Sequence, residues 1–561
     1  MRVIPMKKKT GPSKGRIIAF SIAIFLVAAI LSGLWYWNTH KKAIVRNKLE
    51  TVVREKSNGL YKIKYDSLRM DEINGYLSIS DMNFSYDSTR YRELTKAGKE
   101  PSILLDIHIP EISVSGVKTP RALIGKEIVG RKLEIKNPVI HIIYTGSGPD
   151  PSQAVAPKAI YEQILGNLDL IQADSILISG AQIHTSNRKT KRPGMQLQDV
   201  FITLVNVKVD SSSNADTSLI LFAKEAHISC GKLAWSSPDN LYNYSAASIS
   251  VNSVSRQLLL KNFRMAPTIN EEAFVNSLPT QDDRFDFSVS DVRVQSINLQ
   301  QLLEEKIIAD HIIFPSPSLK IYRDLAIPRD KKNRVGAYPH QLMQTIPVLF
   351  HINKLTVTDG FIEYKERHAV SRLAGKIQYY HVNAAISNFT NDKKAIAVNN
   401  IMTVEMSTRF LNQASLKVTG RFYLLHPKGR FDLEGTFGAM DGRLLNPVIE
   451  CTGLTRIKTG KINGAWFSLQ GEDYNIDGSV KILYEDLKVA ALEKDLGSAQ
   501  LDKKSFSSFL VNIKIKNSNP SGNDDPRVAQ VHLDRNTNAS FFNFAWKSVF
   551  QGLMGTVGLK Q

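Results

Sequence analysis

Residues 133–142 read LEIKNPVIHI and residues 176–185 read ILISGAQIHT, and these two stretches indicate the fold class. In the first, apolar residues stand at offsets 0, 2, 7 and 9, at Leu133, Ile135, Ile140 and Ile142. The second repeats the first three of these positions 43 residues later (176 − 133), at Ile176, Ile178 and Ile183. A second pair with the same spacing (355 − 312) consists of Ile312, Phe314, Leu319 and Ile321, then Leu355, Val357, Ile362 and Tyr364. Leu77, Ile79, Phe84 and Tyr86 also fit, so we expect one structural unit to be repeated.

The offsets have a geometric meaning, because residues two apart on a strand share a face. The step from offset 2 to offset 7 is odd, so a plain strand would turn the second pair to the opposite face. Turn or bulge formers stand in the gap and can restore the parity. They are Asp81-Met82-Asn83, Asn137-Pro138, Ser179-Gly180, Pro315-Ser316-Pro317 and Asp359-Gly360. Each unit is therefore predicted to be a bent strand or tight strand pair with one apolar face.

Short helical stretches precede several units, and proline starts three of them, where its missing N–H does no harm. These stretches are Pro120 to Lys126, Pro157 to Gly166, Asn298 to Lys306 and Pro339 to Ile346. The repeated unit is predicted to run helix, strand, bend, strand.

The N-terminus carries an uncharged run of 21 residues, Ile17 to Trp37 (37 − 17 + 1). This is about the length that crosses the ~30 Å hydrocarbon core as a helix. Six basic residues precede the run, four closely follow it, and it ends in an aromatic Trp-Tyr-Trp. A cleaved signal peptide has a shorter apolar region that ends in small residues. A retained anchor with a cytoplasmic N-terminus is the predicted arrangement.

Composition predicts a large β-rich protein. The 43% hydrophobic content suffices for a large core, and alternating segments such as Val205, Val207 and Val209 are typical of half-buried strands. No long Pro/Gly/Ser linker divides the chain. The least structured stretches are predicted to be surface loops: 146–157, 210–217, 329–337 and 517–526.

Catalytic and metal-binding motifs are missing from the sequence. It has no nucleophile elbow, no phosphate-binding or dinucleotide fingerprint, and no zinc-helix histidine spacing. Two cysteines, Cys230 and Cys451, build no disulfide framework and either pair or stay free. The carboxylate pairs Asp282-Asp283 and Asp524-Asp525 are expected to be solvated turns. We therefore expect no enzyme, no metal and no cofactor.

The formal net charge of +19 raises the question of nucleic-acid binding. Lysines alternate with apolar residues, as in Leu416-Lys417-Val418, which predicts a cationic outer strand face. Such a face is no recognition helix or stacking platform. Ordinary solubility charge and attraction to an anionic membrane both remain open.

Several segments together resemble the AsmA-like family of membrane-anchored envelope proteins, relatives of TamB and of the bridge-like lipid-transfer proteins. The resemblance begins with the anchor and GYLSI at 75–79 and is strongest from Arg421 to Leu492. The matching segments there are FDLEGTF at 431–437, MD at 440–441, LNP at 445–447, KTGKI at 458–462, GSV at 478–480 and YEDLKV at 484–489. The ending FFNFAWKSVFQG at 541–552 is also similar. Coverage is most of the chain, although each motif alone is degenerate.

The resemblance implies a transmembrane helix followed by an elongated, twisted antiparallel sheet, curled into a U-shaped trough with an apolar concave face for lipid acyl chains. It implies no catalytic residues. The expected parts are a cytoplasmic basic tail (1–16), the anchor (17–37), a β-groove of helix-strand units (38–420), an AsmA-like C-terminal β region (421–536) and a C-terminal amphipathic helix (537–561). Roughly 25 strands at ~4.8 Å each would extend about 120 Å.

The expected function is that of an inner-membrane protein with a periplasmic bulk, which binds phospholipid and supports lipid traffic between membranes or outer-membrane assembly, alone or with envelope proteins. All fifteen residues of the two 43-residue pairs are candidates for the lipid groove. A non-enzymatic structural or protein-binding β-repeat protein with closed cores is the main alternative. An envelope hydrolase with an unrecognised site is a third.

The C-terminal segment carries Phe542, Ala545, Trp546, Val549, Phe550 and Leu553 at helical spacing. Asn538 or Ser540 is expected to cap this helix, and later glycines are expected to weaken its extension. Either the helix covers an edge of the sheet, or Phe542, Trp546 and Phe550 contact a membrane or partner.

Overall fold

The computed structural model describes residues 51–558 except 52, 56, 72, 118–126, 146–169, 190–192, 211, 214–217, 370–371, 454, 492, 495–500 and 503–515. The predicted tail 1–16, the predicted anchor 17–37 and the predicted helical stretches at 120–126 and 157–166 lie outside these residues.

Within the described part of the chain, no helix has both the length and the apolar character needed to cross a membrane.

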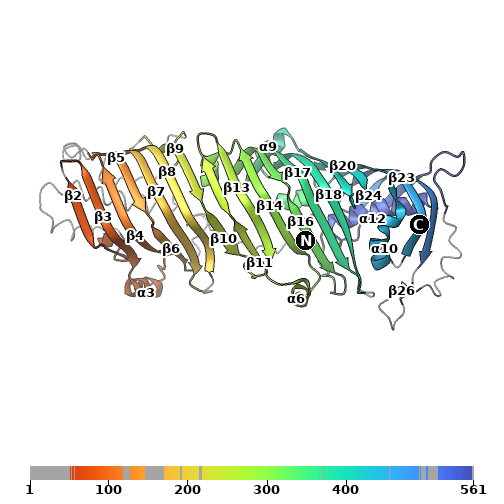
Figure 1. Cartoon of the computed structure of the whole chain (residues 1–561), viewed down its shortest axis with the longest axis horizontal. Helices are drawn as coiled ribbons and strands as arrows, with labels where there is room; N and C mark the ends of the chain where they lie inside the picture. The colour runs from red at the N-terminus through yellow and green to blue at the C-terminus, as the bar shows by residue number, and fades with distance from the viewer. Residues whose placement is uncertain are drawn as a thin grey trace.

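A single mixed sheet of 25 strands forms the body of the molecule, so the prediction of a mainly β protein is confirmed. The strands follow one another across the sheet in chain order, as the colour gradient in Figure 1 shows. The first strands are β1 (Tyr61–Lys64), β2 (Ser67–Asp71), β3 (Tyr76–Tyr86), β4 (Ile103–Ser115), β5 (Glu127–Lys136), β6 (Val139–Tyr144), β7 (Leu170–Asn187), β8 (Pro193–Asp210), β9 (Ala223–Cys230) and β10 (Lys232–Ser236). The middle strands are β11 (Tyr242–Ala246), β12 (Ser248–Asn252), β13 (Gln257–Pro267), β14 (Arg284–Gln295), β15 (Ile307–Pro315), β16 (Ser318–Asp324), β17 (Phe350–Arg367), β18 (Ala374–Thr390) and β19 (Ile401–Phe410). The last are β20 (Ala414–Tyr423), β21 (Phe431–Phe437), β22 (Met440–Asp441), β23 (Thr455–Gly471), β24 (Asn475–Ala491) and β27 (Val528–Asp534), while β25 (Glu493–Lys494) and β26 (Leu501–Asp502) pair separately.

Six pairs of short strands share a position in the sheet, because both members pair with the same neighbour. For example, β5 and β6 both lie against β4 and β7. The other pairs are β1/β2, β9/β10, β11/β12, β15/β16 and β21/β22. The 25 strands therefore fill 19 positions (25 − 6). At ~4.8 Å per step the sheet extends about 86 Å, which corrects the 120 Å expected from a simple strand count.

The 43-residue repeat is the register of two parallel pairings. Leu133 lies opposite Ile176 and Ile140 opposite Ile183, where β5 and β6 run parallel to β7. Ile312 likewise lies opposite Leu355, where β15 and β16 run parallel to β17. The prediction of an antiparallel sheet is wrong at these two places, and the sheet is mixed. A parallel neighbour needs a connection of a dozen or more residues, and the 25 residues from 325 to 349 provide one (349 − 325 + 1).

The predicted parity-restoring bends are confirmed. Each of the five gaps contains a residue with positive φ: Asp81 (48°), Asn137 (49°), Gly180 (64°), Ser316 (45°) and Asp359 (53°). On β3, Leu77, Ile79 and Phe84 consequently enter the same buried cluster, although an odd step separates them. The left-handed conformation suits Asn, Asp and Gly, which explains why those residues occupy most of the bends.

We expect Gly180→Ala to lower the free energy of unfolding by about 1–2 kcal/mol, because alanine is strained at φ 64° and its Cβ would stand 2.3 Å from Oδ1 of Asn137. Gly130→Ala is the matched control, since its Cβ would meet no atom nearer than 3.7 Å. Chemical denaturation of both variants is the measurement. Equal stability of the two would contradict the role of the bend.

Helices, most of them short, lie between the strands and after the last one. Two of them confirm predicted stretches, α7 (Leu299–Leu303) and α8 (Pro339–Met343). The others are α3 (Ser88–Lys96), α6 (Glu271–Asn276), α9 (Lys393–Val398), α10 (Asn446–Gly453), α12 (Phe541–Thr556) and the 3-10 turn η2 (Gly442–Leu445). The predicted loops at 329–337 and 517–526 carry no helix or strand beyond one isolated bridge at Asn519.

The two largest buried clusters lie along the sheet. The first contains side chains from β1 and from each of the strands β3 through β9. Among them, Met82, Leu105 and Ile112 are fully buried. The second joins β14 onward with α7, α8 and α12. The helix α10 packs against β23 and also against β17 and β18, which lie several positions away across the sheet. The C-terminal strands therefore bend around their helices.

Candidate functional site

One uninterrupted line of apolar residues crosses the whole sheet, and we call it the central row. Each member lies directly opposite the next in the strand register. Its 19 members, one per position, are Leu68, Ile79, Ile112, Ile135, Ile178, Ile202, Ile228, Val251, Leu258, Val294, Ile312, Leu355, Ile386, Val404, Gly420, Leu433, Leu469, Gly478 and Val531. All are aliphatic except the two glycines, so the row presents hydrocarbon from end to end.

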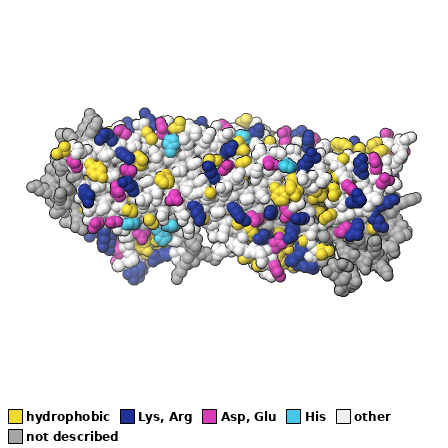
Figure 2. All heavy atoms as spheres, in the orientation of Figure 1, with side chains coloured by type: hydrophobic (Ala, Val, Ile, Leu, Met, Phe, Trp, Pro, Cys, Tyr) yellow, Lys and Arg dark blue, Asp and Glu magenta, His cyan; other side chains and the backbone are white. Residues whose placement is uncertain are grey.

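The residues next to the central row belong to the opposite face, and those on one side of it form a second register row that is polar in all but one case. This outer row comprises Arg69, Ser78, Ser113, Glu134, Leu177, Thr203, His227, Asn252, Gln257, Gln295, His311, Lys354, Ser387, Thr403, Arg421, Asp432, Gln470, Asp477 and His532. The face shown in Figure 2 carries Lys and Arg side chains interspersed with Asp and Glu, with hydrophobic side chains gathered in its right half. The sheet is therefore amphipathic, because an apolar row on one face lies next to a mostly polar row on the other.

The structure brings the fifteen predicted groove residues onto one face. Ile135, Ile178, Ile312 and Leu355 belong to the central row itself. The other members lie in rows beside it, since cross-strand partners share a face. They are Leu133, Ile140, Ile142, Ile176, Ile183, Phe314, Leu319, Ile321, Val357, Ile362 and Tyr364.

Sequence reasoning missed an aromatic row on the same face. The register row of Ile362 and Leu319 continues across the sheet through Phe287, Met265, Tyr244 and Trp235. Trp235 and Tyr244 stack with ring centroids 4.9 Å apart. Alternation within β10, β11 and β13 signals strands, but their register is set by turns that carry no apolar offset pattern.

Burial along the central row changes with position. Ile79, Ile112 and Ile135 are buried, and so are Leu433, Leu469 and Val531 at the other end. Between these ends, the row is half-buried from Ile178 to Leu258 and again from Leu355 to Val404. An apolar strip that its own protein leaves partly uncovered can accept hydrocarbon from outside.

The helix α12 covers the last position of the central row. A Cβ on Gly552 would stand 2.3 Å from Val480 and 2.9 Å from Val531, so the helix lies directly on β24 and β27. Gln551 donates to the backbone carbonyl of His532 at 3.1 Å, on the last strand described. The prediction that this helix covers an edge is consistent with these contacts.

A buried cation joins α8 to the start of α12. The guanidinium of Arg535 donates to the carbonyls of Asp473 and Arg334 and lies 4.3 Å from the ring centroid of Tyr338. Burial lowers the pKa of Arg535. Tyr338 in turn packs edge-on against Phe431 and Phe541, so strands and helices far apart in sequence meet around one arginine.

His340 lies in the same cluster, 5.3 Å from Phe422 between ring centroids. Burial lowers its pKa to about 4, against smaller opposing effects of Asp473 and the Gly429 backbone. Neither ring nitrogen has a hydrogen-bond partner of good geometry among the described residues.

A second ionic cluster ties the ends of β14, β16, β17 and the turn before β18. Asp324 accepts hydrogen bonds from Arg367 and Arg372, and Asp283 forms a two-pronged pair with Arg323 at 2.6 and 2.7 Å. Burial opposes ionisation of Asp324, but the hydrogen bonds from Arg372, Ala326 and Arg367 lower its pKa overall. Asp283 is buried, so the expectation of a solvated turn at 282–283 is wrong, whereas Asp524 and Asp525 are exposed as expected.

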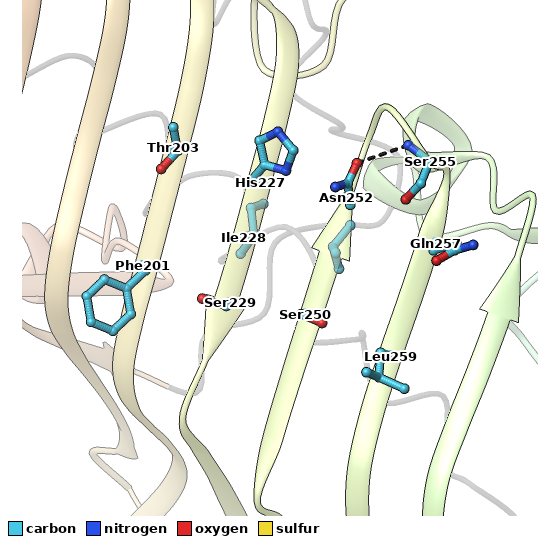
Figure 3. A pocket seen from close by; sticks show the side chains of 11 residues that line it. Phe201, Thr203, His227, Ile228, Ser229, Ser250, Asn252, Ser255, Gln257 and Leu259 are labelled. Atoms are coloured by element: carbon cyan, nitrogen blue, oxygen red, sulfur yellow. Dashed lines mark hydrogen bonds between the residues drawn. The ribbon is translucent and has the colours of Figure 1, made fainter. Parts of the chain in front are cut away.

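A shallow depression of about 340 Å³ lies on the outer face, across β8, β9, β12 and β13 (Figure 3). Its lining combines hydroxyl, amide and imidazole groups with apolar side chains such as Phe201 and Leu259. Asn252 accepts a hydrogen bond from the backbone of Ser255. Among the described residues that line the depression there is no Asp, Glu, Lys or Arg.

Metal-ligating groups do not converge in the described ranges, where no three His, Cys, Asp or Glu side chains are placed to hold an ion. Cys230 is a free, buried thiol whose pKa is raised by burial. No protein-family model matches the chain, and no curated protein matches its sequence.

Proposed function

We propose that this chain is an AsmA-like protein, anchored in the inner membrane of a two-membrane bacterium by residues 17–37, whose periplasmic sheet binds phospholipid. Acyl chains lie along the central row, and head groups stay at the rim of a U-shaped trough. The protein supports lipid transport between membranes or assembly of the outer membrane. No chemical step and no cofactor are required.

The observation that carries this proposal is the unbroken central row with its two half-buried stretches, from Ile178 to Leu258 and from Leu355 to Val404. Each methylene that leaves water for such a face gains about 0.8 kcal/mol. The row offers many similar aliphatic positions, with no charged side chain to fix a head group. Binding is therefore divided over many weak, nearly equivalent sites, which is the condition for a lipid to move along the sheet rather than stay.

Photo-cross-linking tests the proposal by comparing adjacent residues on opposite faces. A benzophenone amino acid is placed at Leu258 or Leu355 in the central row, and at Gln257 or Lys354 as matched controls. In cells grown with radiolabelled phosphate, we expect phospholipid adducts about tenfold stronger at the two central-row positions, because only that face stabilises hydrocarbon.

Equal labelling of the two faces would exclude an apolar lipid path. Absence of adducts at all four positions in a folded protein would favour the alternative of a structural β-repeat protein, in which the central row is an ordinary core. Native mass spectrometry of the same samples counts bound lipid independently of the cross-linker.

A further inference from the structure

The helix α12 has two apolar sides, and only one of them is used by the fold. Phe541, Phe544, Ser548 and Gly552 are buried against the strands. On the other side, Phe542, Trp546 and Phe550 follow at four-residue steps and are 73%, 57% and 48% exposed. We call these three side chains the aromatic ridge.

The ridge is presented by a firmly attached helix. Ser540 caps its start by accepting a hydrogen bond from the Asn543 N–H. Arg527 donates to the carbonyl of Thr556 at 3.0 Å near its end. The rings of Trp546 and Phe550 lie 6.1 Å apart between centroids, so these two form one apolar surface. Exposed apolar residues on an ordinary protein surface are scattered singly, whereas these three large rings lie on one line.

Charge around the ridge is mostly positive. Between residues 541 and 556 the sole ionisable side chain is Lys547, and the first turn carries no carboxylate. Arg334 donates to the carbonyl of Asn538, just before the helix, and so brings the loop with exposed Arg329, Lys331 and Lys332 to this end. The acidic Asp330 there is paired with Arg334. Asp477 and Asp534 belong to the outer face, and exposed Asp524 and Asp525 lie in the loop that leads to Arg527.

We propose that the aromatic ridge docks α12 on the surface of a bilayer that contains anionic lipid. Phe and Trp side chains on a helix that lies flat favour the interface between head groups and acyl chains, and nearby Lys and Arg add attraction to anionic head groups. Three rings supply roughly 600 Å² at most, below the ~800 Å² per partner of a stable protein interface. A bilayer needs no matching surface. Docking would place the buried end of the central row beside a membrane. The docking proposal does not depend on whether lipid binds to that row.

Vesicle binding of the full chain tests the docking. The protein is held in nanodiscs of neutral phosphatidylcholine and mixed with vesicles of phosphatidylcholine with or without phosphatidylglycerol. We expect co-flotation with the anionic vesicles, weakened about tenfold or more in the triple variant Phe542→Ser, Trp546→Ser and Phe550→Ser, and weakened by high salt. Phe201→Ser is the control, because it removes an equally exposed ring from the outer face.

Trp546 provides a local readout, since the emission of Trp546→Phe can be subtracted from that of the wild type. Brominated lipid in the added vesicles should quench the Trp546 emission. A wild type that binds no better than the triple variant, or an unquenched Trp546, would overturn the proposal. Co-flotation that occurs only when a second protein is present would instead identify a protein partner and equally overturn the proposal. Bound-lipid counts of the triple variant stay at the wild-type level if only the docking is lost, so failure here is distinguishable from failure of the proposed function.

Discussion

Replacing Arg535 by alanine is expected to cost about 3–5 kcal/mol of unfolding free energy, the range for removing one partner from a buried ionic cluster. The side chain of Arg535 is fully buried, and its loss leaves the carbonyls of Asp473 and Arg334 without their donors. It also removes the cation from the face of Tyr338. Chemical denaturation measures the total effect, and hydrogen exchange of residues 334–343 and 535–548 shows where the structure opens.

Arg443→Ala is the matched control, because Arg443 pairs with Asp441 at an exposed site, where solvent screens the charges and the pair contributes little to stability. Arg535→Lys keeps the charge but not the planar fork, so we expect a loss between those of the other two variants. If Arg535→Ala were as stable as Arg443→Ala, the buried cluster would not be what joins α8 to α12.

Acid should weaken the same region through His340. Its pKa is about 4 in the folded protein and 6.5 in the unfolded chain. Above pH 6.5 both forms are neutral and the residue adds no pH dependence. Below pH 6.5 the unfolded chain binds a proton that the folded protein does not, so stability falls as the pH drops towards 4. The full loss is about 3 kcal/mol, at 1.36 kcal/mol per pKa unit.

Titration of unfolding free energy from pH 8 to 4 measures this loss as a difference between the wild type and His340→Phe. Other groups contribute equally to both proteins, so the difference isolates His340. We expect the phenylalanine variant to be the more stable by a growing margin below pH 6.5. His532→Phe, at an exposed site on β27, is a control of opposite sign. The hydrogen bond with Asp477 raises the pKa of His532, so this variant should become less stable than the wild type, not more stable, as the pH falls. A constant difference across the range would contradict the assignment.

The sequence predicted most of what depends on local pattern. The offsets around Leu133 and Ile312 located strands and their bends. The 43-residue spacing predicted a repeated unit, and only the structure shows that the repeats are partners in two parallel pairings. What it lacked was direction. The equal spacing shows that two strands have the same apolar pattern, but it does not show whether they run parallel. For β16 and β17 the direction depends on the path of the 25 residues that connect them.

The helix at the C-terminus shows a different limit. Its periodicity is correct, yet the sequence grouped Phe542 and Trp546 with Ala545 and Val549 as one face. In the structure Ala545 and Val549 turn towards the strands, while the aromatic ridge points away. A helix that is apolar nearly all round gives no single stripe, so its packing face depends on where Gly552 permits close approach. Asp283 was missed for a related reason, since its partner Arg323 is 40 residues away.

The two parallel pairings have a consequence for how such a molecule changes in length. Each strand position contacts only the positions before and after it, and the sheet has a first and a last strand in its described part. A duplicated segment of 43 residues would insert one more position, about 4.8 Å, and would leave every apolar side chain on its original face. The length of the sheet can therefore change in steps of one strand position. Evolution can lengthen or shorten it between fixed end pieces without redesigning either end.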